Sequence, residues 1–182
     1  MSVDLREVRE QWRQKLQSGS IDDCVEALRQ ISSHESVTGL TSDVIPLAGH
    51  DDDEIRMWAS EALESSIQAE VAELLVLIQM LESTEDSEIC YWSATILGRL
   101  GSDAASAAPV LEACVRKSMY LPARERATWA LAQIGPAASI ALPTLKDIAE
   151  SSPPRLQRLA IEAIDRIEHT SADQSSPSED AA

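Results

Sequence analysis

The chain has no phenylalanine, three cysteines, three histidines and no long apolar run. The longest unbroken apolar run is Leu74–Ile78, far short of the roughly 20 residues that a membrane-spanning helix needs. The charged segment 1–13 has no signal-peptide core. Three widely spaced thiols fit free cysteines in a reducing compartment. We therefore expect a cytoplasmic protein that does not bind membranes.

The sequence also lacks the motifs of common catalytic and metal-binding sites. It has no glycine-rich phosphate loop and no pair of histidines at helical spacing. His34, His50 and His169 lie in different parts of the chain, and His34-Glu35 is a single pair. A single His-Glu pair cannot supply the ligands of a di-iron centre. We predict no catalytic, cofactor-binding or metal-binding residues.

What the sequence does contain is one pattern that returns about every 34 residues. The best copy lies in 123–149 and carries Arg124, Ala127, Ala130, Leu131, Ile134 and Gly135. The copy before it carries Cys90, Ser93, Ile96, Leu97, Leu100 and Gly101, and the one before that Arg56, Ala59, Ala62 and Leu63. Weaker copies at the two ends carry Cys24, Ala27, Leu28 and Ile31, and Ala160, Ala163, Ile164 and Ile167. Such a period indicates a solenoid of stacked units.

Each copy of the pattern is predicted to form a pair of helices. Its apolar positions recur at steps of three and four, which is typical of one buried helical face. Gly101 and Gly135 are predicted to end the first helices, because glycine adopts the left-handed conformation at little cost. Pro109 and Pro143 are predicted to lie in the first turn of the second helices. A single pair buries too little apolar surface, so neighbouring pairs must stack.

These residues resemble a known family. The runs Tyr91-Trp92, Ile96–Gly101 and Trp129–Leu131 are similar to HEAT repeats, in the short form found in phycobilisome bilin lyases and bacterial scaffold proteins. The resemblance covers about 21–168 and implies an all-α, right-handed α-solenoid of about five stacked helix pairs.

The function that this resemblance implies is less specific, because lyases, hydroxylases, DNA glycosylases and adaptors all use the repeat. We favour a non-enzymatic scaffold that binds a protein partner. The alternative is a subunit of a bilin lyase-like enzyme that presents a client protein and a tetrapyrrole.

Three regions are predicted. Residues 1–18 should form a capping helix with Leu5, Val8, Trp12 and Leu16 on its buried face and a solvated outer face. Residues 19–168 should form one repeat array with a continuous core. Residues 169–182 are rich in Ser, Asp, Glu, Ala and Pro, so we expect a disordered acidic tail.

The net charge of −16 is unevenly distributed. Residues 43–90 contain 13 acids and a single arginine, so this segment carries 12 of the 16 net negative charges. Most of the excess falls in two turns between repeats, which should lie on one edge: Asp51, Asp52, Asp53 and Glu54, then Glu82, Glu85, Asp86 and Glu88. Helix dipoles and solubility explain such acids without a partner. The alternative is an acidic edge that binds a basic protein; nucleic acid would need a basic surface.

The second helices contain further residues that could bind a partner. Positions 34 residues apart give two series, Glu82, Arg116 and Glu150, and Ile78, Glu112 and Lys146. Alternating charges predict ion pairs between neighbouring repeats, each worth about 0–1 kcal/mol at a surface. The other interpretation is a charged binding groove.

Two residue types remain. Trp58, Trp92 and Trp129 flank the core positions, which favours packing between repeats over an aromatic binding strip. Cys24 and Cys114 are predicted to be small buried hydrophobic residues. Cys90 stands where other copies have arginine, so we expect it to be more exposed.

Overall fold

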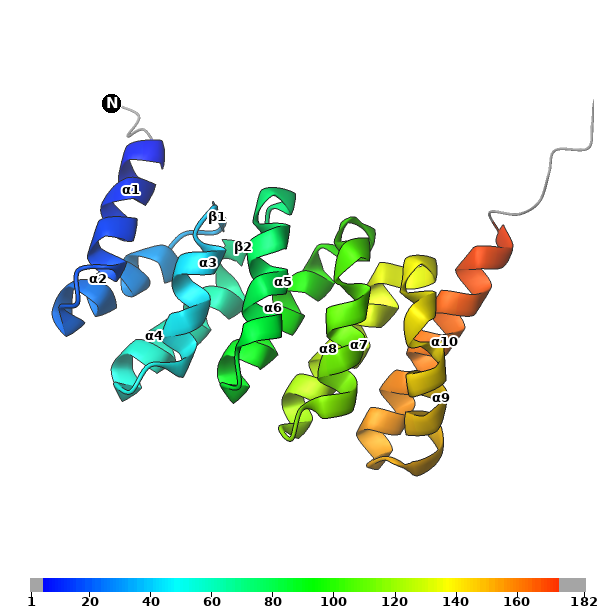
Figure 1. Cartoon of the computed structure of the whole chain (residues 1–182). Coiled ribbons are helices and arrows are strands. Elements are labelled where there is room, and N and C mark those ends of the chain that lie inside the picture. Colours follow the sequence, from blue (N-terminus) through cyan, green and yellow to red (C-terminus); the bar gives the residue numbers. More distant parts are fainter. Residues whose placement is uncertain (1–4, 174–182) are drawn as a thin grey trace, which may run out of the picture. The chain divides into compact units, whose positions relative to one another are not determined.

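The computed structural model describes residues 5–173. In this range, everything except turns, short connections and one pair of two-residue strands is helical, so the all-α prediction is confirmed. The chain forms two compact units, residues 1–96 and residues 97 onward, and the boundary falls inside α6 (Ser87–Arg99). Each unit consists of paired helices (Figure 1). The prediction of one continuous core over 19–168 stays a prediction.

The first unit begins with α1 (Leu5–Leu16), α2 (Ile21–Ser32), β1 (Val37–Thr38), α3 (Thr41–Val44) and the 3-10 helix η1 (Ile45–Gly49). It continues with α4 (Asp53–Ser65), β2 (Ile67–Gln68), η2 (Val71–Glu73), α5 (Leu74–Ser83) and the first part of α6. Helices α2 and α4 pack along each other, and α1 covers α2 and α3.

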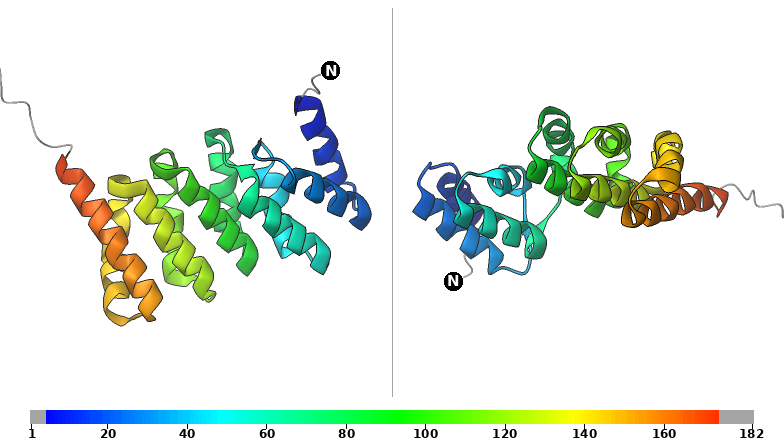
Figure 2. Two further views of the ribbon diagram at one scale, coloured as in Figure 1. Left: turned by 180° about the vertical axis from the view of Figure 1, so that it is seen from behind. Right: turned by 90° about the horizontal axis from the view of Figure 1, so that it is seen from below.

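The second unit contains the end of α6, η3 (Gly101–Ala107), α7 (Ala108–Lys117), α8 (Leu121–Ile134), η4 (Gly135–Ala141), α9 (Leu142–Ser151) and α10 (Pro154–Asp173). In this unit α8 and α10 form one layer, and α7 and α9 form the other (Figures 1 and 2). Helix α10 continues beyond Glu168, where we predicted that the tail would begin. Residues 174–182 of that tail lie outside the described range.

The repeat frame, by which we mean the apolar positions that recur about every 34 residues, locates the core correctly. Ala130 and Leu131 are fully buried. So are the equivalent leucines of the second helices, Leu77, Leu111 and Leu145. Alanine at the contact positions lets neighbouring helices approach closely and favours the helix itself.

The predicted helix ends are also confirmed. Gly101 and Gly135 have positive φ angles of 58° and 73°, a conformation that costs glycine little. Pro109 and Pro143 lie in the first turns of α7 and α9, where a missing amide proton matters least.

The pairing of β1 with β2 was not predicted. The strands are parallel, with Val37 opposite Ile67 and Thr38 opposite Gln68. Ile67 stands 34 residues before Gly101. A β-branched residue resists positive φ, so at this turn the chain leaves the helix extended and pairs with the turn of the preceding repeat. Val37 and Ile67 are both buried there.

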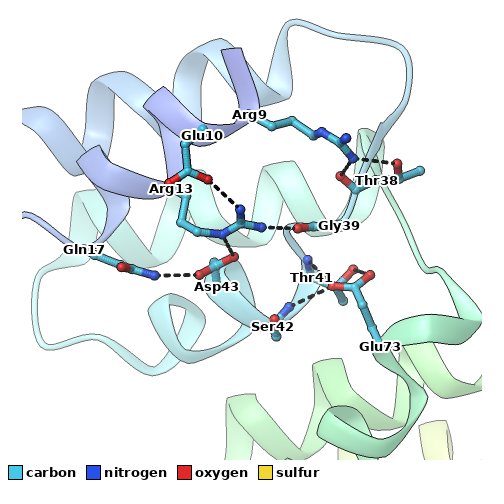
Figure 3. A network of polar contacts seen from close by, with 10 residues as sticks. All are labelled: Arg9, Glu10, Arg13, Gln17, Thr38, Gly39, Thr41, Ser42, Asp43 and Glu73. Carbon is cyan, nitrogen blue, oxygen red and sulfur yellow. Dashed lines mark hydrogen bonds and ion pairs between the residues drawn. The ribbon is translucent and has the colours of Figure 1, made fainter. Parts of the chain in front are cut away.

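The capping helix is attached more firmly than we expected. Trp12 and Leu16 are buried as predicted. The basic side chains do not all face solvent: Arg13 donates to the Asp43 carboxylate at 3.0 Å and to the Gly39 carbonyl at 2.6 Å (Figure 3). The hydrogen bond to Asp43 is the main reason that the pKa of Arg13 is raised. Helix α1 is therefore fixed to the first repeat by polar as well as apolar contacts.

The same region contains a second polar junction, which Figure 3 also shows. The Glu73 carboxylate accepts hydrogen bonds from the Thr41 amide at 2.9 Å, the Thr41 hydroxyl at 2.8 Å and the Ser42 amide at 3.3 Å. These bonds satisfy free amide groups at the start of α3. The irregular second helix of the first repeat is thus held by a carboxylate of the next repeat.

The contact between α6 and α8 gives a prediction. Alanine normally stabilises a helix relative to glycine by about 1 kcal/mol. At Gly98, however, a Cβ atom would lie 2.3 Å from Cζ3 of Trp129 and 3.0 Å from the backbone of Ala130. We expect Gly98→Ala to lower the free energy of unfolding by about 1–3 kcal/mol, measured by urea denaturation. Adding Trp129→Leu should reduce this effect of the alanine. A stabilising Gly98→Ala would contradict the packing described.

Candidate functional site

The two acid-rich turns lie side by side in the first unit, as the repeat frame predicts. A Cβ atom on Gly49 would lie 2.9 Å from Cγ and from both oxygens of the Asp86 carboxylate. The turn before α4 is therefore in contact with the turn before α6. The predicted acidic edge thus has a structural basis in this contact.

Two of the acids in these turns cap helices. The Asp52 carboxylate accepts from the amides of Glu54 and Ile55 at 2.9 and 3.1 Å. The Asp86 carboxylate accepts from the amides of Glu88 and Ile89 at 2.9 and 3.0 Å. Each cap is worth about 0.5–2 kcal/mol. Asp52 and Asp86 therefore have a structural role that needs no partner.

Two more acids of the first turn are paired with arginine. Glu54 binds Arg29 of α2 at 2.6 Å, with both side chains about half exposed. Asp53 forms an ion pair with Arg56, whose guanidinium also donates to the carbonyls of His50 and Asp51 at 2.6 and 2.9 Å. Arg56 thus holds the backbone of the turn as well as neutralising part of its charge.

Three carboxylates of the predicted edge are exposed and have no hydrogen bond or ion pair to any described residue. They belong to Asp51 in the first turn, to Glu82 near the end of α5 and to Glu85 in the second turn. Glu88 is half-buried in the first turn of α6. The charge available to a partner is therefore concentrated on Asp51, Glu82 and Glu85.

The ion pairs that we predicted between second helices are wrong in their partners. Arg116 pairs with Glu112 of its own helix at 3.3 Å. Glu112 also accepts from the Thr144 hydroxyl of α9 at 2.5 Å. Lys146 pairs with Glu168 of α10 at 2.9 Å. Residues four apart on one helix lie next to each other, which places Arg116 beside Glu112. Glu150 is exposed at the end of α9.

The three tryptophans of the repeats have different environments. Trp92 is 5% exposed, and the ring of Trp129 lies against Gly98 of α6, so both pack between helices as favoured. Trp58 is half-buried on α4, with the guanidinium of Arg29 5.1 Å from its ring centre. It lines a pocket of about 460 Å³ between α2 and α4, together with Arg29, Ser32, Ser33, Met57 and Glu61. We did not predict this pocket from the sequence, in which the adjacent large apolar residues Met57 and Trp58 were the available signal.

The cysteines are all buried. This confirms the prediction for Cys24 and Cys114 but corrects the one for Cys90, which is 9% exposed. The Cys90 thiol approaches the carbonyl of Thr84 at 3.9 Å, so the side chain turns inward where arginine would reach along the surface. Burial raises the pKa of the Cys90 thiol, and the negative charge of Asp86 raises it further. Cys24 has a raised pKa for the same reason, with Asp52 as the charge.

The histidines within the described side chains have local roles. His34 Nδ1 lies 2.8 Å from the Gln30 carbonyl, and its ring meets Trp12 edge to face. His50 Nδ1 accepts from the Asp52 amide at 3.0 Å. Over the described part of the chain, no group of three or more His, Cys, Asp or Glu side chains could hold a metal ion. No helix in that part is both long and apolar enough to cross a bilayer.

Comparison with known proteins gives one family match. A family model described as HEAT repeats matches residues 44–132 and, in a second placement, residues 74–165. Together the two matches cover more than half of the chain. Comparison with curated proteins gave no match.

The contact between the two acidic turns can be tested at Gly49. Alanine there would push the Asp86 carboxylate away from the amides that it caps. We expect Gly49→Ala to lower the free energy of unfolding by about 1 kcal/mol, measured by urea denaturation. In an Asp86→Ala background the same change should cost much less. An equal cost in both backgrounds would mean that the turns do not touch.

The environment of Cys90 gives a pH prediction. In a chain with Cys24→Ala and Cys114→Ala, iodoacetamide should modify Cys90 slowly, and the rate should rise at a pH above the ordinary thiol range. Asp86→Asn keeps a capping residue but removes the negative charge. Its pH–rate midpoint should therefore lie lower. Asp51→Asn is the control, and a midpoint that Asp86→Asn leaves unchanged would contradict the assigned cause.

Proposed function

We propose that this chain, which belongs to the HEAT repeat family, is a non-enzymatic scaffold that binds a basic protein partner along its acidic edge. HEAT repeats generally mediate protein–protein interaction, and the family as a whole supports a protein partner. The edge consists of the two turns that meet at Gly49 and Asp86. That contact is the observation on which the proposal depends, because it joins two acid-rich segments into one surface.

The charges of this edge exceed what the fold uses. Asp52 and Asp86 cap helices, and Asp53 and Glu54 pair with arginines. Asp51, Glu82 and Glu85 remain exposed without such a role among the described residues. Exposed charge of one sign attracts an oppositely charged partner and speeds association. The net charge of −16 disfavours nucleic acid as the partner.

The proposal includes a cytoplasmic location. Three buried cysteines that form no disulfide suit a reducing compartment. It also places recognition rather than catalysis at the edge, since the local histidines and thiols are engaged in turns and in the core.

The test compares two variants with the same change in net charge. Asp51→Asn, Asp53→Asn and Glu85→Gln together weaken the edge while leaving the caps Asp52 and Asp86 intact. The matched control combines Asp22→Asn, Asp103→Asn and Asp147→Asn, which lie outside the edge. Each tagged protein is used to capture partners from a native lysate, and recovered proteins are quantified by mass spectrometry.

We expect the parent to recover a basic protein at low salt and to lose most of it at high salt, because screening limits electrostatic reach to about 8 Å at physiological ionic strength. The edge variant should lose that protein at low salt, and the control should keep it. Equal recovery by the parent and the edge variant, or equal loss in both variants, would contradict a specific acidic edge.

A further inference from the structure

Helix α5 carries apolar side chains on its outer face as well as on its inner face. Leu77 and Leu81 point into the core, with exposed fractions of 0% and 6%. Leu75, on the side of α5 opposite Leu77, is 74% exposed, and its neighbours Val71 of η2 and Val76 of α5 are 53% and 41% exposed. These three exposed apolar residues lie within six positions of the chain where η2 meets α5, and we call them the apolar strip.

The repeat itself does not require this strip. The position of Leu75 is taken by Pro109 in α7 and by Pro143 in α9. The position of the neighbouring Ile78 is taken by Glu112 and Lys146. The core leucine of each second helix is the same in all three repeats and is fully buried. The outer apolar residues of α5 are therefore additions to a helix that already fills its place in the core.

The charge around the strip has one sign. No lysine, arginine or histidine occurs from Met57 to Gly98. Glu82 lies on the same side of α5, seven residues after Leu75, and Glu85 follows in the next turn. Both carboxylates are exposed and make no ion pair with any described residue. The face thus presents an apolar strip that ends in free carboxylates.

We propose that this face of α5 binds a cationic amphipathic helix of a partner protein. Apolar side chains of that helix cover Leu75 and its neighbours, and its lysine or arginine side chains pair with Glu82 and Glu85. Seven residues of helix span about 10 Å. The partner helix therefore needs its apolar and cationic groups about two turns apart. This inference rests on the proposed protein-binding function and extends the acidic edge to a defined apolar contact.

The negative charge of the chain also favours a cationic helix over two other possible occupants of this face. A second copy of the chain would bring the same carboxylates toward each other, and like charges that meet at an interface disfavour association. An anionic lipid surface would be repelled by a protein of net charge −16. A cationic amphipathic helix meets neither obstacle.

The experiment uses synthetic 18-residue peptides labelled with fluorescein and the full chain. One peptide of leucine and lysine has its leucines on one helical face. A second has the same composition in an order that gives no such face, and a third has glutamate in place of lysine. Fluorescence anisotropy gives the dissociation constant of each peptide for the parent, for Leu75→Ser and for the control Ile161→Ser. Ile161 of α10 is 56% exposed and lies outside the face.

We expect the amphipathic cationic peptide to bind the parent best. Leu75→Ser should weaken its binding at least tenfold, because burial of one leucine side chain is worth more than one tenfold step in affinity. Ile161→Ser should have no effect. Glu82→Gln with Glu85→Gln should weaken binding at low salt and have little effect at high salt.

Four results would overturn the proposal. These are no binding of the amphipathic peptide, equal binding of the scrambled peptide, unchanged binding by Leu75→Ser, and a dimer in sedimentation that Leu75→Ser dissociates, which would identify a second copy as the occupant. The acidic-edge function is judged separately. If Asp51→Asn, Asp53→Asn and Glu85→Gln abolish lysate capture while Leu75→Ser leaves peptide binding unchanged, the edge stands and the α5 proposal fails.

Discussion

The constraint on which this edge of the protein depends is the satisfaction of free amide groups where each first helix begins. Asp52 and Asp86 meet it for α4 and α6 with almost identical geometry. Because the Asp86 carboxylate rests against Gly49, the two capped turns must lie together. Some negative charge at this edge is therefore a consequence of folding. The function that we propose uses the charge in excess of that requirement.

One position of the repeat contributes to the imbalance of charge. This position is the fourth residue of each first helix. It is occupied by Arg56 in α4, by Cys90 in α6 and by Arg124 in α8. Arg56 and Arg124 donate to carbonyls of the preceding turn or helix, Arg124 to Val115 at 2.8 Å. Cys90 makes a weaker contact of the same kind with Thr84 and carries no positive charge at neutral pH. The second acidic turn therefore lacks the arginine that partly neutralises the first.

The sequence predicted those features that depend on the repeat frame. Gly101, Gly135, Pro109, Pro143 and the buried alanines all have the roles that period and spacing indicate. We did not predict the β1–β2 pair, because a pattern of helical positions does not indicate which backbone conformation follows a helix that has no glycine at its end. The burial of Cys90 was missed because the frame assigned it the exposure of an arginine. A short thiol at the same position turns inward instead.

The candidate site was predictable as a region but not residue by residue. Composition alone distinguishes neither Asp51 from Asp52 nor Glu85 from Asp86, yet one of each pair caps a helix and the other is exposed without a partner among the described residues. That distinction depends on which backbone amides each carboxylate reaches in the folded chain. Leu75 shows the complementary case. The two following repeats have proline at the position of Leu75, so the repeat pattern identifies Leu75 as an exception. Because Leu75 is exposed, this exception does not contribute to the core. In a repeat protein, exposed departures of this kind separate residues available to a partner from residues required by stacking.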